Sequence, residues 1–217
     1  MGSSVRDKIV EAALDRFHTL GFNGCGVQEI VDKAGIPKGS FYNYFKAKEV
    51  LAAEVLKAYV DGSRMEMLSD KAIAPFKRIR AHFEFLASSH ARFGYRKGCL
   101  IGNIAAETSE DMPIVRKALA RVLANWAELV ADAIRDGQAD GSIDARLDAE
   151  ETARFLISSW EGAVIRMKIV NSRQPLDDFF SLAFRLFNQS DAPLSSSPKR
   201  GSTRSARSRG APKRRLK

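Results

Sequence analysis

Apolar residues recur at intervals of three and four along most of the chain, which is the period of an α-helix that buries one face. The first such stretch spans residues 5–20, with Ile9, Ala12, Ala13, Phe17 and Leu20 on its apolar side. The helical pattern continues to residue 188. We therefore predict an all-α protein of about nine helices. These cover residues 5–20, 27–34 and a short segment after Pro37, and the others begin near residues 48, 75, 99, 113, 148 and 175.

Glycines, prolines and capping residues mark the predicted helix ends. Gly21 and Gly35 close the first two helices, because glycine adopts the left-handed backbone of a helix C-terminus without steric cost. The turn-rich segment 137–142 ends the long helix that starts near residue 113, and Asp148 with Glu151 resembles a capping box. Three other helices are predicted to start at a proline, because the first helical turn does not need the N–H that proline lacks. These residues are Pro75, Pro113 and Pro175.

Residues 34–45 are predicted to form a tight corner followed by a very short helix. Gly35 permits the turn, and Pro37 prevents the chain from continuing as helix. Phe41 and Phe45 lie four residues apart and share one face, which we expect to be core. The other face carries groups that bind phosphates and base edges, namely Lys38, Ser40, Tyr42, Asn43 and Tyr44.

The last two predicted helices, over residues 148–188, are apolar on more than one side. Phe155, Ile165 and Ile169 lie off the main apolar stripe of the first, and the second is rich in Phe and Leu. A helix that must be covered on two sides needs a partner beyond its own core. We expect these helices to pack against their copies in a two-fold homodimer, with a core formed within one chain as the alternative.

The positive charge is concentrated at the C-terminal end of the chain. The protein has a net charge of +9, but residues 189–217 contain nine Lys or Arg against Asp191, which leaves only +1 for residues 1–188. Charge alone therefore says little about DNA binding by the folded part. The segment 189–217 is rich in Ser, Pro and Gly, so we predict a disordered tail that promotes solubility or acts as a non-specific DNA arm.

Composition also limits the location and the chemistry. We expect a cytoplasmic protein without a membrane span, because the apolar runs are shorter than the roughly 18 residues that cross a bilayer and the N-terminus lacks a signal peptide. Cys25 and Cys99 cannot form a disulfide framework. The histidines His18, His82 and His90 are not spaced as a ligand set, so we predict no metal and no cofactor.

The stretch from Ile30 to Glu49, IVDKAGIPKGSFYNYFKAKE, resembles the DNA-binding signature of the TetR family of transcriptional regulators. The resemblance implies a helix-turn-helix domain over residues 1–47, a ligand-binding and dimerisation domain over 48–188, and the tail over 189–217. Ala47 departs from the usual capping residue, which weakens the start of the fourth helix by around 1 kcal/mol. The resemblance implies phosphate contacts from Ser40, Tyr44 and Lys48, backbone contact from Gln28, and contacts to base edges or the adjoining sugar-phosphate from Lys38, Gly39, Tyr42 and Asn43.

The same resemblance implies a dimeric repressor on palindromic double-stranded operator DNA, released by a small-molecule inducer that changes the separation of the two recognition helices. A rival class is an enzyme that uses Cys99 with His82 or His90 as base. No phosphate-binding loop, nucleophile elbow or acid-histidine constellation supports catalysis. We therefore predict that the protein is not an enzyme.

Two segments resemble a subgroup of the family that responds to reactive electrophiles, such as the repressors of N-ethylmaleimide reductase and of acrylate utilisation. They are Arg96–Glu107, RKGCLIGNIAAE, and Trp160–Lys168, WEGAVIRMK. The resemblance implies that Cys99 senses the inducer. A helix N-terminus after two basic residues lowers a thiol pKa, and Lys168 is placed to approach Cys99 from the facing helix.

Other interpretations of these residues remain open. Cys99 is otherwise a small buried apolar residue at a glycine-flanked corner, and Cys25 has no basic neighbours, which favours a structural role. The inducer can equally be an apolar molecule held reversibly in a helical pocket. The aromatic residues Phe83, Tyr95, Trp126 and Trp160 are candidates to line such a pocket, although aromatic residues at helical spacing also form core.

Overall fold

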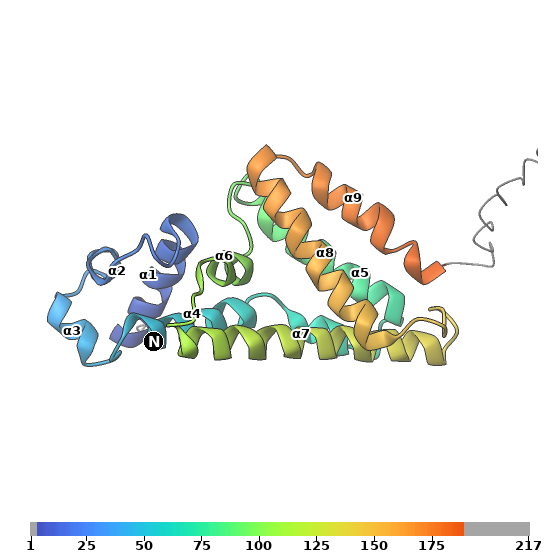
Figure 1. Ribbon diagram of the computed structural model, residues 1–217, viewed down its shortest axis with the longest axis horizontal. Coiled ribbons are helices and arrows are strands. Elements are labelled where there is room, and N and C mark those ends of the chain that lie inside the picture. The colour runs from blue at the N-terminus through green and yellow to red at the C-terminus, as the bar shows by residue number, and fades with distance from the viewer. Residues whose placement is uncertain (1–3, 189–217) are drawn as a thin grey trace, which may run out of the picture.

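The computed structural model describes residues 4–188, which fold into nine α-helices and two short 3₁₀ helices without any strand in this range. The all-α prediction is confirmed. Figure 1 shows α1 to α3 at one end, α4 and the long α7 along the base, and α8 and α9 side by side at the other end. The helices are α1 Val5–Leu20, α2 Val27–Ala34, α3 Lys38–Tyr42, α4 Lys48–Asp61, α5 Pro75–Ala91, α6 Leu100–Glu107, α7 Pro113–Ala139, α8 Ala149–Val170 and α9 Gln174–Ala183, with η1 Met65–Ser69 and η2 Leu186–Asn188.

Helices α1, α2 and α3 pack into a small unit from which α4 leads away along α7 (Figure 1). Its core consists of fully buried side chains from each of these helices, including Ile9, Phe17, Ile30 and Phe41. Short helices are not stable alone in water, so α2 and α3 depend on this shared core for their conformation. The unit presents the corner between α2 and α3 at the far end of the molecule (Figure 1).

The larger part of the molecule is built around an aromatic centre. The ring centroid of Phe83 on α5 lies 5.3 Å from that of Trp160 on α8 and 5.1 Å from that of Phe179 on α9. Trp126 on α7 lies 6.0 Å from the same ring. Tilted aromatic pairs at such distances contribute about 0.5–1.5 kcal/mol each beyond burial. The aromatic stripe is therefore core, and it holds α5, α7, α8 and α9 together.

The helix ends follow the sequence signals with one difference. Gly35 is left-handed with φ 68°, the Asp148 side chain accepts a hydrogen bond from Glu151 N at 2.7 Å, and Ala47 begins α4 without a side-chain cap. α7 ends at Ala139, within the predicted segment 137–142, but Gly137 itself lies inside the helix. Ile143 folds back onto Gly137, where a Cβ would lie 2.6 Å from its Cδ1, so this glycine serves close packing and not a turn.

Residues 189–217, for which the sequence predicts a disordered basic tail, lie outside the described residues. Within residues 4–188, no helix is both long enough and apolar enough to cross a membrane. The same residues contain no cluster of three or more His, Cys, Asp or Glu that could hold a metal ion.

Candidate DNA-binding surface and sensor site

The corner between α2 and α3 separates apolar from polar side chains as the sequence predicts. Phe41 is 0% exposed and packs 5.8 Å, ring to ring, from Phe45, which is also buried. Tyr42 is 56% exposed, and Tyr44 is exposed as well. The backbone amide of Ser40 donates to the carbonyl of Pro37 at 2.9 Å, which closes the first turn of α3. The hydroxyl and amide side chains are thus presented outward on a helix too short to move independently of its core.

Most of the predicted DNA contacts lie on this outer surface. Lys38, Gly39, Tyr42, Asn43 and Tyr44 are exposed, and Ser40 is half-buried beside them. Gln28 is exposed on α2, where its amide donates to Asp32 Oδ1 at 2.7 Å. Nothing lies within 4 Å of a Cβ built on Gly39, so a large partner can approach the backbone there.

Lys48 is placed differently from the other predicted contacts. Its ammonium donates to the carbonyl oxygens of Phe22 and Cys25, at 2.8 and 2.9 Å, and lies 4.2 Å from the centroid of the Phe22 ring. Two of its three N–H donors are therefore used to bind the start of α4 to the loop between α1 and α2. A phosphate contact from Lys48 stays a prediction that depends on the third donor.

Cys99 immediately precedes the first turn of α6, so the predicted position at a helix N-terminus is correct. The residue is buried. The hydroxyl of Tyr59 on α4 donates toward Sγ at 3.8 Å, and the carboxylate of Glu161 on α8 lies beside the thiol. Cys99 therefore lies where α4, α6 and α8 meet.

The charge around the thiol differs from the sequence prediction. Burial, reinforced by the negative charge of Glu161, raises the pKa of Cys99 well above its ordinary value. Lys97 does not offset this effect, because its ammonium lies 3.5 Å from Asp15 Oδ1 on α1. The expectation that the helix N-terminus, Arg96 and Lys97 lower the thiol pKa was therefore wrong, and the thiol is protonated at neutral pH.

Glu161 is a site residue that the sequence analysis missed. Its carboxylate packs directly against the backbone of Gly102 on α6, where any side chain would collide with it. Burial raises the pKa of this carboxyl group. A signal was present in the sequence, because a glutamate directly after the core residue Trp160 interrupts a helix that is apolar on two sides. Only the fold reveals that it faces Cys99.

Lys168, about two helical turns after Glu161 on α8, also reaches α6. Its ammonium donates to Asn103 Oδ1 at 3.5 Å, and its Cδ would lie 3.3 Å from a Cβ on Gly98. The predicted approach from the facing helix is therefore correct for the segment around Cys99. Direct contact between Lys168 and the thiol stays a prediction.

A small cavity adjoins Cys99. Its volume is about 20 Å³ for the centre of a water-sized sphere, enough for roughly one water molecule. Of the predicted pocket residues, Trp126 and Trp160 line it, while Phe83 packs behind them in the core and Tyr95 lies elsewhere. The other lining residues are Tyr59, Ser63, Met65, His82, Leu86, His90, Cys99 and Ile101.

Helix α6 is bound to the α1–α3 unit at both of its ends. Before its first turn, His18 Nε2 on α1 donates to the carbonyl of Gly98 at 2.6 Å. At its last residue, the Glu107 carboxylate accepts hydrogen bonds from the backbone amides of Phe22 and Asn23, at 3.2 and 2.6 Å. Figure 1 shows α6 between the α1–α3 unit and α8. A displacement of α6 would therefore be transmitted to the DNA-binding unit.

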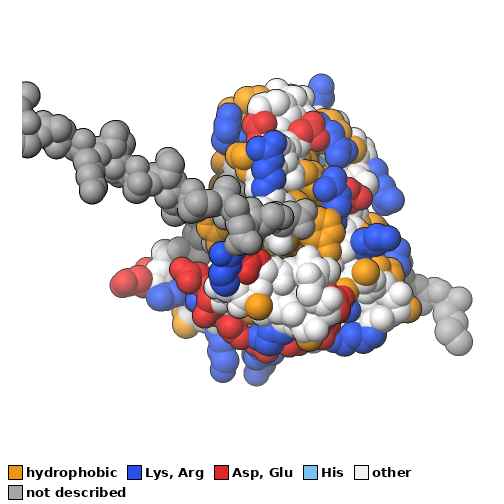
Figure 2. All heavy atoms as spheres, turned by 90° about the vertical axis from the view of Figure 1, so that its right-hand side faces the viewer, with side chains coloured by type: hydrophobic (Ala, Val, Ile, Leu, Met, Phe, Trp, Pro, Cys, Tyr) orange, Lys and Arg blue, Asp and Glu red, His pale blue; other side chains and the backbone are white. Residues whose placement is uncertain are grey.

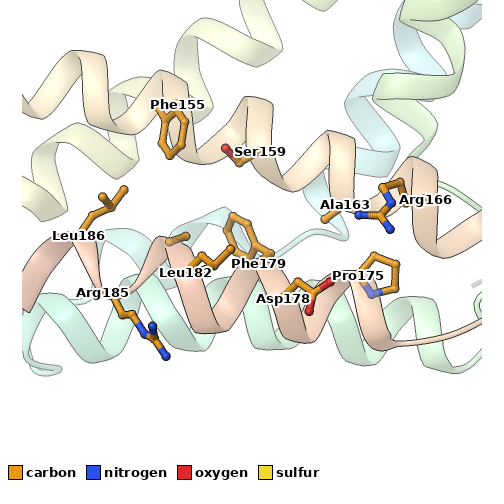
Figure 3. A pocket seen from close by; sticks show the side chains of 11 residues that line it. Phe155, Ser159, Ala163, Arg166, Pro175, Asp178, Phe179, Leu182, Arg185 and Leu186 are labelled. Atoms are coloured by element: carbon orange, nitrogen blue, oxygen red, sulfur yellow. The ribbon is translucent and has the colours of Figure 1, made fainter.

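Helices α8 and α9 share an exposed apolar groove on one side. Phe155 and Leu182 are exposed on its walls, and Phe179 and Ala163 lie along it (Figure 3). Ile169, near the end of α8, is 74% exposed. Figure 2 looks at the end of the molecule where α7 and α9 end, and hydrophobic side chains lie among charged ones on that face. This apolar surface is where the sequence predicts the dimer interface.

Comparison with known proteins identifies the fold and its family. Residues 9–55 match "Bacterial regulatory proteins, tetR family", and residues 75–182 match "Tetracyclin repressor-like, C-terminal domain". The chain belongs to the TetR family. It is 35% identical to the HTH-type transcriptional repressor DhaR of Mycobacterium sp. strain GP1, over 83% of this chain and 90% of that one.

Two crystal structures of TetR-family proteins are similar to this chain over most of their length. The regulatory protein TetR from Rhodobacter sphaeroides has a TM-score of 0.78 and 32% identity, over 85% of this chain and 100% of that one. NemR from Escherichia coli, in a structure described as its reduced form, has a TM-score of 0.76 and 26% identity, over 82% and 94%. The TetR family consists of transcriptional regulators and is not typically enzymatic, which agrees with the expected absence of catalysis.

Proposed function

We propose that this protein is a dimeric repressor of a palindromic operator, released when a small electrophile reacts with Cys99. The observation that carries the proposal is the position of Cys99 at the start of α6, the helix bound at both ends to the DNA-binding unit. Relatives of this chain include proteins named as transcriptional repressors, which supports repression as the mode of regulation. The resemblance of segments 96–107 and 160–168 to electrophile-responsive repressors supports the inducer class.

The proposed DNA surface is the outer side of α3. Its two exposed tyrosines and Asn43 are the groups that would enter the major groove, and the net charge of only +1 for residues 1–188 means that these few contacts must supply the specificity. A gel-shift titration with the DNA beside the gene tests this. Tyr42→Ala should weaken specific binding roughly 5- to 150-fold, since a good base contact contributes on the order of 1–3 kcal/mol. Ile114→Ala, an exposed apolar residue at the start of α7, is the control and should bind normally.

The proposed dimer forms through the groove between α8 and α9. Leu182 is 64% exposed on its wall, and a carboxylate placed there would be buried without a partner in the dimer. Leu182→Glu should therefore give monomers in sedimentation equilibrium, whereas Ile114→Glu should remain dimeric. A dimer that tolerates Leu182→Glu would exclude this interface. Loss of the dimer should also abolish operator binding, because two half-sites are read together.

The proposed release follows from the lack of space around the thiol. A cavity of about 20 Å³ cannot take up the atoms added by an adduct, so the start of α6 must move away from α4 and α8. The bonds from Gly98 to His18 and from Glu107 to the amides of Phe22 and Asn23 would carry this movement to α1 and the following loop. The spacing of the two recognition helices then no longer fits the operator.

Intact-mass analysis with parallel operator binding tests the sensor. Brief exposure to a maleimide or an acrylamide should add one reagent mass at Cys99 and release the DNA in step with the modification. Cys99→Ser should neither be modified at this site nor release DNA, while Cys25→Ser should behave like the native protein. If Cys99→Ser releases DNA with the native dose response, the alternative of a reversibly bound apolar ligand is favoured.

A further inference from the structure

The cavity beside Cys99 is lined by buried polar groups without a well-aligned hydrogen-bond partner among residues 4–188. Trp126 is 2% exposed, and its Nε1–H donates to no acceptor among residues 4–188. His82 is 0% exposed, and neither of its ring nitrogens forms a hydrogen bond of good geometry with a described residue, although the backbone of Arg64 lies beside the ring. Buried polar atoms without partners are rare in folded proteins and call for an explanation. The two rings lie 5.8 Å apart and both line the cavity next to the Cys99 thiol, so polar groups are available inside this part of the core.

The size and charge of the cavity restrict what it can accept. Its remaining walls are largely apolar, including Leu86, Ile101 and Trp160, and no Lys, Arg, Asp or Glu of residues 4–188 lines it. Burial keeps both cavity histidines neutral, with the pKa of His82 and of His90 lowered to about 4. An anion would be buried here without a cation. The lining therefore suits an uncharged group with one hydrogen-bond acceptor, and a molecule larger than water is accommodated only as the start of α6 moves away from α4 and α8.

On another side of the thiol lies the carboxylate of Glu161. Both of its oxygens are buried and accept no hydrogen bond from an N–H or O–H of the described residues. The Cys99 thiol is the hydrogen-bond donor that faces them. The absence of a side chain at Gly102 is what allows the carboxylate this close to α6. Cys99 thus has an acceptor for its proton and an adjoining space for a reaction partner.

We propose that this cavity selects small uncharged electrophiles with a carbonyl-conjugated double bond, that Trp126 Nε1–H binds the carbonyl oxygen, and that Glu161 takes the thiol proton as Cys99 adds. The proposal rests on the proposed function and specifies its inducer class. Acrylamide has the required charge and acceptor.

The addition is balanced without any further reactant. A sulfur electron pair of Cys99 forms the bond to the terminal carbon of the double bond, while the S–H proton passes to the Glu161 carboxylate. The π electrons move toward the carbonyl oxygen, where the Trp126 N–H stabilises the developing negative charge. The proton on Glu161 then returns to the carbon next to the carbonyl. The product is a thioether, and the carboxylate is restored.

The other titratable groups near the thiol do not replace Glu161 in this role. Tyr59 on α4 donates its own proton toward Sγ, and burial raises its pKa well above the ordinary value, so it stays protonated. His18 on α1 contacts the Tyr59 ring and is bonded to Gly98 O. His90 is bonded to the carbonyl of Lys97 through Nδ1, at 3.2 Å. Lys168 is directed to Asn103.

The test measures the rate of Cys99 modification by acrylamide and by acrylate, each divided by its rate with glutathione. This ratio removes the difference in intrinsic reactivity between the two reagents. The native protein should favour acrylamide over acrylate by at least about 100-fold more than glutathione does, because the anion has no partner in the cavity. Its rate with acrylamide should be nearly constant from pH 7 to 9, since the proton is taken within the site.

Variants separate the roles. Glu161→Gln should react about 100-fold more slowly at pH 7, the usual contribution of general base catalysis, and its rate should rise about tenfold per pH unit as thiolate forms. Trp126→Phe should slow the reaction about tenfold or more without changing the pH profile. Glu150→Gln, an exposed glutamate on the same helix, is the control and should react like the native protein.

The outcomes distinguish the two proposals. If Cys99 reacts with neither reagent, the proposed sensor function fails. If it reacts with the selectivity of glutathione, and the native rate rises tenfold per pH unit as it does in Glu161→Gln, the cavity and Glu161 have no such role, while covalent sensing at Cys99 stands. The native pH profile and selectivity decide the question even if a variant does not fold.

Discussion

The corner at α2–α3 and the cavity at Cys99 distribute their polar groups in opposite ways. At the corner, the buried rings of Phe41 and Phe45 face inward, and the hydroxyls of the two tyrosines face solvent. Around Cys99, the indole of Trp126, the imidazole of His82 and the carboxylate of Glu161 are buried without a well-aligned hydrogen bond to any residue in the range 4–188. A surface that binds DNA exposes its polar groups to solvent. A site that binds a small molecule has polar groups buried in the core and available for hydrogen bonds to that molecule.

Each region also contains one free, buried cysteine, and burial raises the thiol pKa of both. Cys25 is enclosed by the α1–α3 core, and its thiol donates to the neighbouring carbonyl of Gly26 at 3.5 Å. Cys99 has a buried carboxylate beside it and a cavity next to it. A raised pKa therefore does not separate a structural cysteine from a reactive one. The unpartnered groups around the thiol do.

The largest effect is expected in the core of the corner. Phe41→Ala should reduce the free energy of unfolding by about 3–5 kcal/mol, because the ring is fully buried and leaves a cavity. Tyr42→Ala should reduce it by less than about 1 kcal/mol, since that ring is largely exposed. Chemical denaturation measures both. Equal losses in the two variants would contradict the two-sided description of α3.

Acid should destabilise the cavity region through its histidines. His82 and His90 have pKa values of about 4 in the folded protein, against 6.5 ordinarily, because of burial. Between these values the unfolded chain binds protons that the folded chain does not, so stability falls as the pH falls, by on the order of 2–3 kcal/mol per histidine at pH 4.5. The free energy of unfolding should be measured at pH 7 and 4.5 for both proteins. The decrease on acidification should be smaller in His82→Leu than in the native protein by the contribution of one histidine. An unchanged pH dependence would mean that His82 is not buried as a neutral group.

Glycine substitutions provide a matched pair between the regions. Gly102→Ala should displace the Glu161 carboxylate and slow acrylamide addition at Cys99 about tenfold, because a Cβ there collides with that carboxylate. Gly39→Ala meets no atom within 4 Å and should leave the reaction unchanged. Intact-mass kinetics measure both rates. A native rate for Gly102→Ala would show that the position of the carboxylate does not matter.

The smallest effect concerns the connection between the regions. Glu107→Gln should lose about 1 kcal/mol of coupling, because a neutral side chain accepts weaker hydrogen bonds from the amides of Phe22 and Asn23. The ratio of operator affinities before and after modification at Cys99 should shrink about fivefold. The exposed Glu110 serves as the control in Glu110→Gln. If the ratio is unaffected, the movement reaches the DNA-binding unit by another route.

Sequence reasoning predicted the fold almost completely, because helix ends and apolar faces depend on local signals. Gly35, Pro113 and Asp148 mark ends that the structure confirms within a residue. Gly137 is the exception, since only the position of Ile143 explains a glycine inside a helix. The exposed face of α3 was predictable for the same local reason.

The sensor region was predictable only in part, because its properties depend on segments far apart in the chain. The helix position of Cys99 followed from the sequence, but the direction of its pKa did not, since that depends on burial by α4 and on Glu161, which is 62 residues away along the chain. The unpartnered atoms of Trp126 and His82 have no sequence signal. Tryptophan and histidine at helical spacing look like ordinary core.

The loop between α1 and α2 determines which residues can be exchanged to give this regulator a new operator. Its carbonyls bind Lys48 of α4, and its amides bind Glu107 of α6. A chimera that replaced residues 1–47 with those of another regulator would exchange this junction together with the recognition helix. Grafting residues 27–45 alone would keep the junction, and so should redirect the protein to a new operator while its response to the inducer is retained.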